Sequence, residues 1–112
     1  MTNFKNALAE NREFIQSLND KEFWGVVQKE APTDMGRYVA PAKRGNLQEM
    51  IYLGATFLLA TNALPRNIAI ALRLLQTGLE LGNEDARFFK NMSQRLIDEH
   101  LEAEDAATGQ LV

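Results

Sequence analysis

The sequence predicts an all-α protein built from antiparallel helical hairpins. Two Gly-Asn steps, Gly45-Asn46 and Gly82-Asn83, stand 37 positions apart, and a run with helical periodicity follows each of them. Glycine accepts the left-handed backbone that closes one helix, and the asparagine after it can cap the next. A repeat of this length is typical of stacked helix pairs. The 112 residues, 46% hydrophobic and 24% charged, have the size and composition of one globular domain.

An N-terminal helix pair is expected within residues 1–30. The first helix, over about residues 4–18, carries one stripe of contact positions formed by Phe4, Leu8, Asn11, Ile15 and Leu18. Asp20 is expected to cap a short second helix that runs to Glu30. Pro32 follows and disfavours its continuation, so this helix should stop there.

Residues 31–45 are predicted to form an irregular basic linker. Gly36 and Pro41 interrupt a weak apolar pattern in this stretch. Its basic residues are Arg37, Lys43 and Arg44. Because Gly and Pro are the strongest local breakers of regular structure, we expect a loop with about one helical turn.

Three further helices are expected in residues 46–104. The third helix runs from Asn46 to about Thr61, and its wide apolar arc indicates a central position. Asn67 is the expected cap of the fourth, which is apolar on two sides and extends to about Leu81. About five helices are therefore predicted in total.

Asn83 is the expected cap of the fifth helix, and acidic residues in its first turn favour the positive end of the helix dipole. This helix should fray after about Glu104, which leaves residues 105–112 as an acidic tail. The tail contrasts with residues 35–97, where eight basic residues stand against four acidic ones.

Part of the chain resembles a Sel-one-like repeat, a helical hairpin related to the tetratricopeptide repeat. The matching positions are Gly45-Asn46, Leu53-Gly54, Phe57, Leu64-Pro65-Arg66-Asn67, Ala71, Leu74-Leu75, Gly78 and Gly82-Asn83 with Ala86. They make up one full copy and the start of a second. The resemblance implies a short stack of helical hairpins whose concave face holds a protein segment. Its small residues, Gly54, Ala71 and Gly78, would let the paired helices approach closely.

Catalytic chemistry, metal binding and cofactor binding are not expected. The chain has no cysteine and a single histidine, His100, whose nearby carboxylates do not make a ligand set with defined geometry. Glu84 and Asp85 have a structural reason to stand at a helix start. Serine and threonine lack a neighbouring histidine base, and single glycines do not form a phosphate-binding loop. We therefore expect a protein that is not an enzyme.

Protein binding is the predicted function, in the manner of a small bacterial inhibitor, immunity protein or adaptor. Residues on one face of the third helix are expected to contact the partner, namely Gln48, Glu49, Tyr52 and Thr56. Phe88 and Phe89 are either covered by the first two helices or left as an interface for a partner or a second copy of the chain.

A nucleic-acid-associated regulator is the alternative function. Arg37, Lys43 and Arg44, next to an aromatic residue, could contact phosphates, although a net charge of −3 argues against strong binding. No apolar run approaches the ~20 residues that span a bilayer. The N-terminal residues lack the apolar stretch of a secretory signal, so a cytoplasmic location is expected.

Overall fold

A computed structural model describes residues 3–31, 33–59 and 64–110 of the chain. Within these ranges the protein is helical and contains no strand, which confirms the all-α prediction. The elements are α1 (Phe4–Ser17), α2 (Asp20–Glu30), a 3-10 turn (Thr33–Met35), α3 (Gly36–Lys43), α4 (Leu47–Leu59), α5 (Pro65–Glu80) and α6 (Asp85–Gln110). The described chain thus has six α-helices rather than the five that were predicted.

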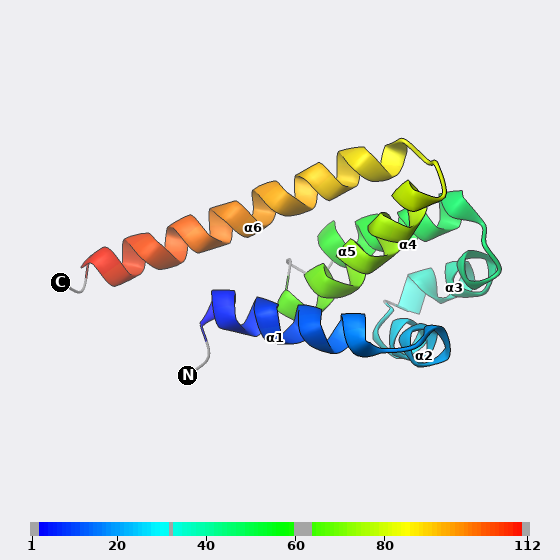
Figure 1. Cartoon of the computed structure of the whole chain (residues 1–112), viewed down its shortest axis with the longest axis horizontal. Coiled ribbons are helices and arrows are strands. Elements are labelled where there is room, and N and C mark those ends of the chain that lie inside the picture. Colours follow the sequence, from blue (N-terminus) through cyan, green and yellow to red (C-terminus); the bar gives the residue numbers. More distant parts are fainter. Residues whose placement is uncertain (1–2, 32, 60–63, 111–112) are drawn as a thin grey trace.

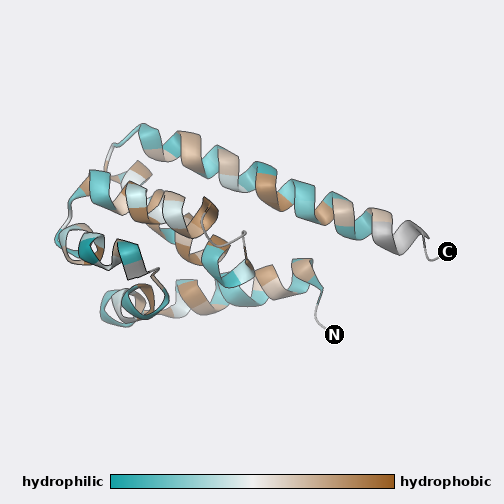
Figure 2. Cartoon of the chain, turned by 180° about the vertical axis from the view of Figure 1, so that it is seen from behind, coloured by the Kyte–Doolittle hydropathy of each residue, from teal (hydrophilic) through white to brown (hydrophobic). Residues whose placement is uncertain are grey.

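The helices are arranged around α5, which packs against α4, α1 and α6 (Figure 1). Its central place follows from its sequence, because apolar residues cover two sides and every residue from Asn67 to Ala71 is buried. Hydrophobic residues accordingly concentrate on α4 and α5 (Figure 2). The molecule measures 51 × 26 × 25 Å, and α6 runs along its long axis.

Helices α4 and α5 form an antiparallel hairpin in which small residues permit close packing. A Cβ atom placed on Gly54 would lie 2.9 Å from Cδ2 of Leu75, and one on Gly78 would lie 3.4 Å from Cγ1 of Ile51. The same Cβ on Gly78 would lie 3.5 Å from the Cβ of Ala86, at the start of α6. The predicted close approach of the paired helices is therefore confirmed at Gly54, whereas at Gly78 an added Cβ would make ordinary van der Waals contacts.

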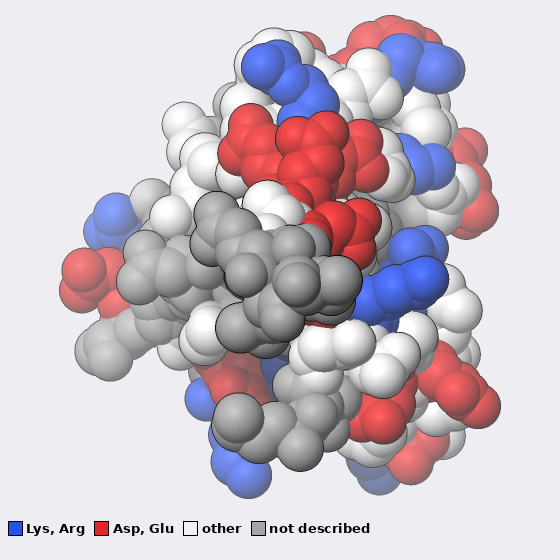
Figure 3. Space-filling view, turned by 90° about the vertical axis from the view of Figure 1, so that its left-hand side faces the viewer, with Lys and Arg blue, Asp and Glu red and all other residues white. Residues whose placement is uncertain are grey.

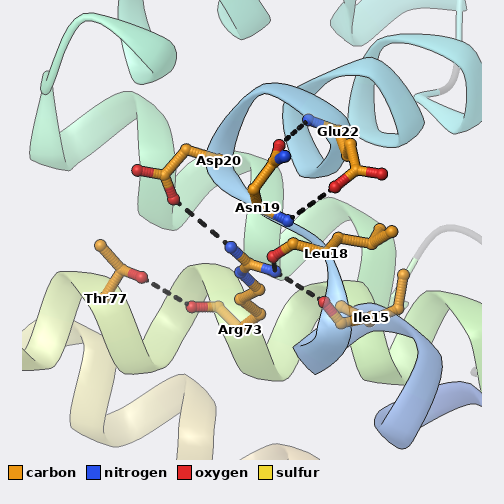
Figure 4. Close-up of polar contacts among 7 residues, drawn as sticks. All are labelled: Ile15, Leu18, Asn19, Asp20, Glu22, Arg73 and Thr77. Atoms are coloured by element: carbon orange, nitrogen blue, oxygen red, sulfur yellow. Dashed lines mark hydrogen bonds and ion pairs between the residues drawn. The ribbon is translucent and has the colours of Figure 1, made fainter.

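The joint between α1 and α2 is fixed by one arginine of α5 (Figure 4). Nη1 of Arg73 donates to the backbone carbonyls of Ile15, at 2.6 Å, and Leu18, at 2.9 Å. The guanidinium also lies 4.1 Å from the ring centroid of Phe23. The last carbonyls of a helix lack a full set of partners within it. Arg73 is the donor to the Leu18 carbonyl, and it adds a shorter bond to the Ile15 carbonyl, which also accepts the Leu18 N–H at 3.4 Å. This contact places α1 against α5 although the two helices are far apart in the sequence.

Helix starts follow the expected chemistry at some caps and differ at others. Asn19, rather than Asp20, caps α2, and it forms a reciprocal capping box with Glu22 (Figure 4). Asn67 is not a cap, because α5 already begins at Pro65, where the missing N–H of proline costs no helical hydrogen bond. The predicted glycine ends are confirmed, since Gly45 has a φ of 99° and Gly82 a φ of 94°.

The prediction of an irregular linker over residues 31–45 is wrong for most of that stretch. A 3-10 turn and then α3 occupy it, and Pro41 lies inside α3. Val39 and Ala42 are buried, and α3 packs on α4, so tertiary burial outweighs the weak local propensity. The predicted fraying after Glu104 is also wrong, because α6 continues to Gln110.

Candidate functional site

An open groove lies between α4 and the first turns of α6. Its volume is about 350 Å³. The residues that line it are Gln48, Ile51, Tyr52, Ala55, Asn83, Asp85, Phe88 and Phe89. We call it the α4/α6 groove. It combines an apolar floor with two large aromatic side chains that are mostly in solvent, Tyr52 at 56% exposure and Phe88 at 62%.

The α4 wall of the groove follows from helical periodicity. Gln48, Tyr52 and Ala55 recur at i, i+4 and i+7, on the side of α4 that faces away from its buried residues. Ile51, which is only 6% exposed, forms the floor and packs in one cluster with Leu75 and Ala86. The buried side of α4 thus holds the helix in place while its neighbouring side stays open.

The α6 wall begins directly after the turn at Gly82. The side chain of Asn83 accepts a hydrogen bond of 2.9 Å from the backbone N–H of Asp85 and so caps the helix. Phe89 is half-buried and packs against the cluster that contains Ile51. The rings of Phe88 and Phe89 meet at an interplanar angle of 82° with their centroids 5.3 Å apart. Phe89 therefore supports the ring that stays exposed.

Tyr52 is held from the other side by α3. Its ring stacks on Tyr38 with centroids 6.1 Å apart and an interplanar angle of 12°. The guanidinium of Arg37 lies 4.8 Å from the Tyr38 ring centroid and donates a hydrogen bond of 2.9 Å to its hydroxyl oxygen. The exposed tyrosine is therefore one end of a stacked row rather than a freely rotating side chain.

Four of the six predicted partner-binding residues line this one groove: Gln48, Tyr52, Phe88 and Phe89. Glu49 and Thr56 do not line it. The hydroxyl of Thr56 donates to the backbone carbonyl of Tyr52. One carboxylate oxygen of the partly buried Glu49 has no hydrogen-bond partner among the residues that the structure describes. The predicted partner-binding residues of α4 and those of α6 therefore line the same groove, except for Glu49 and Thr56.

Sequence reasoning missed four lining residues because each already had a structural role. Ile51 belongs to the apolar arc of its helix, and Asn83 and Asp85 were read only as elements of a helix start. Ala55 carries no chemical signal, although its spacing of three from Tyr52 places it on the same side of α4. The groove forms where α6 packs near α4. The spacing of residues within one helix does not predict that packing.

A second hollow, lined by more charged side chains, lies between α1, α5 and α6, with a volume of about 320 Å³. Its lining residues are Arg12, Gln16, Ala69, Leu72, Arg73, Gln76, Thr77, Glu80 and Lys90. We call it the cationic hollow. The ammonium of Lys90 donates to the side-chain oxygen of Gln76, whose amide nitrogen donates to Glu80 at 3.1 Å.

The residues predicted to contact nucleic acid lie on α3 and at its C-terminal end, whereas the later arginines come from α5 and α6. Arg37, Lys43 and Arg44 are exposed at α3 and its C-terminal end, and Arg37 is engaged with Tyr38. Arg73 is engaged with backbone carbonyls. On the described part of the end that carries both termini, acidic and basic side chains are interspersed (Figure 3). Such mixing gives little of the continuous positive potential that phosphate backbones require.

His100 has a packing role. Its ring stacks on Phe4 with centroids 4.5 Å apart, and a carboxylate oxygen of Glu104 accepts a hydrogen bond of 2.8 Å from the backbone N–H of Phe4. These contacts attach α6 to the start of α1. In the described ranges, no group of three or more histidine and acidic side chains could hold a metal ion. Among the described helices, none has the length and apolar character needed to cross a bilayer.

Comparisons of the chain with protein-family models, with curated proteins and with solved structures find no match. The resemblance to a Sel-one-like repeat therefore depends on its own residues. The packing of α1 against α5 is a contact between elements far apart in the chain, whereas a regular hairpin array brings mainly successive repeats together. The geometry of the two hollows is thus the basis for functional inference.

Proposed function

We propose that this protein is a non-catalytic protein-interaction module that holds a segment of another protein in the α4/α6 groove. The observation that carries the proposal is that Tyr52 and Phe88, 56% and 62% exposed, come from different helices and line the same hollow. Aromatic side chains are enriched among the residues that anchor protein interfaces. Nothing in the fold requires two large rings to remain in solvent at one place.

The arrangement of the groove matches the anatomy of a small binding site. Ile51 and Ala55 give an apolar floor, and Gln48, Asn83 and Asp85 give polar groups at hand for hydrogen bonds to a partner backbone. An apolar centre with polar groups around it excludes water from the central contacts while it fixes the register of the bound segment. The groove therefore suits a segment that inserts one or two apolar side chains.

The exposed rings are already held in place by their neighbours. Phe88 contacts Phe89, and Tyr52 stacks on Tyr38. Because ordering a side chain at an interface costs about 0.5–1.5 kcal/mol, rings restrained before binding reduce that cost. A module without chemistry of its own acts by covering or presenting another protein, so an inhibitor, immunity protein or adaptor is the class of function that we infer.

The test is affinity capture of the tagged protein from lysate of its native source, with and without nuclease. We expect one stoichiometric protein partner that survives nuclease. The double substitution Tyr52→Ala with Phe88→Glu should remove it without unfolding the module, as checked by circular dichroism. The matched control is Phe14→Glu, which adds the same charge at a 41% exposed ring on α1 outside the groove.

Three results would contradict the proposal. Retention of the same partner by the double variant would place the binding surface elsewhere. Recovery of nucleic acid alone, sensitive to nuclease, would favour the regulator that uses Arg37, Lys43 and Arg44. Equal loss of the partner in the Phe14→Glu control would show that added charge, not the groove, determines binding.

A further inference from the structure

We propose that the cationic hollow between α1, α5 and α6 is a second binding site, for a small soluble anion that carries a phosphate group. It lies apart from the α4/α6 groove and shares none of its lining residues. One water occupies about 30 Å³ of liquid, so a hollow of about 320 Å³ holds the volume of about ten waters. That is room for a ligand larger than a single ion.

Charge is distributed unevenly around this hollow. Arg12 comes from α1, Arg73 from α5 and Lys90 from α6, and Glu80 is the single carboxylate among the lining residues. Arg73 is also 3.4 Å from Asp20, which is 95% exposed and therefore well screened by solvent. Three helices thus bring cations to one concave surface, where the local potential favours an anion.

Two of the three cations retain hydrogen-bonding capacity for a ligand. Within the described chain, the guanidinium of Arg12 makes no hydrogen bond or ion pair. Lys90 donates one bond, to Gln76, and an ammonium has three donors. Arg73 is already occupied by the carbonyls of Ile15 and Leu18, so its contribution is its charge.

The chemistry of these donors favours phosphate over a simple carboxylate. An arginine fork matches two phosphate oxygens, and a lysine ammonium binds phosphate as a point charge. The two groups reach the hollow from different helices, and a tetrahedral phosphate presents oxygens in more directions than a planar carboxylate does. Ala69 and Leu72 add an apolar surface to the same lining, which suits the organic part of a phosphate ester.

Such a ligand would join α1 to α6 across α5. Near the start of α1, Phe4 already contacts His100 and Glu104 of α6. A ligand that binds the folded state and not the unfolded chain raises the melting temperature as its concentration rises. Binding should therefore also appear as a thermal shift.

The experiment is titration of the full chain with inorganic pyrophosphate at constant ionic strength, followed by calorimetry and by amide chemical shifts. We expect the largest shifts around Arg12 and Lys90. Arg12→Gln should weaken binding by about tenfold, as expected for loss of a charged hydrogen bond. Glu80→Gln should tighten it, because it removes the carboxylate from the lining. The matched control Arg95→Gln, an exposed arginine of α6 outside the hollow, should leave the affinity unchanged.

Defined outcomes would overturn the proposal. Equal weakening by Arg12→Gln and Arg95→Gln would mean that pyrophosphate responds only to net charge. Equal affinity for succinate would show a carboxylate site instead. Co-sedimentation with phosphatidic acid vesicles, combined with no binding of pyrophosphate, would identify a membrane surface as the ligand. No shift at about 10 mM pyrophosphate would exclude a site with a dissociation constant near 1 mM, which corresponds to about −4 kcal/mol.

Discussion

Helix α4 has two contrasting sides, one closed against α5 and one open toward α6. On the closed side, Gly54 has no room for even one added carbon next to Leu75. On the open side, Tyr52 stands in solvent at the edge of a hollow of about 350 Å³. The comparison shows how one helix can serve stability and recognition separately, because small residues close one interface while large residues leave the other incomplete.

This division determines which substitutions should unfold the protein and which should only change binding. Burial of apolar surface supplies most of the stability of a small domain, and that burial is concentrated where α4 meets α5. Residues on the open side of α4 bury little surface when the chain folds. The comparison is therefore testable by measuring the free energy of unfolding for variants on each side.

The largest effect is expected from Gly54→Val. Its branched side chain would overlap Leu75 and force α4 away from α5, at a cost of about 2–3 kcal/mol in the free energy of unfolding. Urea denaturation followed by circular dichroism measures this loss. The control is Gly25→Ala on α2, where an added Cβ meets nothing within 4 Å and should stabilise by about 0.5–1 kcal/mol. Unchanged stability in Gly54→Val would show that the closed side is not tightly packed.

A somewhat smaller loss is expected from Arg73→Met. Methionine keeps an unbranched stem near Phe23 but removes the donor to the Leu18 carbonyl and leaves the Ile15 carbonyl with only the long bond from the Leu18 N–H (Figure 4). Unsatisfied partly buried acceptors cost about 1–3 kcal/mol, and we expect about 2 kcal/mol here. Hydrogen exchange should become faster in α1 and at the start of α2 before it does in α4. Uniform exchange across the chain would contradict a local role for Arg73.

Much of the helical architecture could be predicted from local sequence, because its signals are local. The stripe of α1, the broad apolar arc of α4 and the two glycines with positive φ each depend on neighbours within a few positions. Helix α3 could not be predicted in this way. Gly36 and Pro41 argue against a helix locally, and the burial of Val39 under tertiary packing is invisible in the local pattern.

The candidate groove was predictable only in part, for the same reason. Tyr52 was predicted on the partner-facing side of its helix, and Phe88 was predicted to be either covered or part of an interface. Their meeting in one hollow depends on the packing of Ala86, at the start of α6, in one cluster with Ile51 of α4 and Leu75 of α5. The contact between α4 and α6 results from tertiary packing and cannot be predicted from the spacing of residues along the sequence. Asn83 and Asp85 therefore line the groove, which their role at the start of the helix does not by itself predict.

A loss of about 1–2 kcal/mol is expected from Gly82→Ala, at the turn that brings α6 to the groove. Its φ of 94° lies in the left-handed region, which costs a residue with a Cβ about 1–2 kcal/mol. An added Cβ meets nothing within 4 Å, so the loss reports backbone strain alone. Thermal unfolding compared with Gly25→Ala gives changes of opposite sign. A gain in Gly82→Ala would show that the turn relaxes to a different backbone and that the α6 wall is not fixed by it.

The smallest effect on stability should come from Phe88→Ala. The ring is 62% exposed and contacts the ring of Phe89, so its removal should change the free energy of unfolding by less than about 0.5 kcal/mol. The same substitution should weaken the captured partner strongly, because aromatic anchors near the centre of an interface often contribute about 2 kcal/mol or more. Urea denaturation and partner affinity, measured on one preparation, separate the two quantities. A loss of stability comparable to that of Gly54→Val would mean that Phe88 belongs to the core, and the open side of α4 would then be closed in solution.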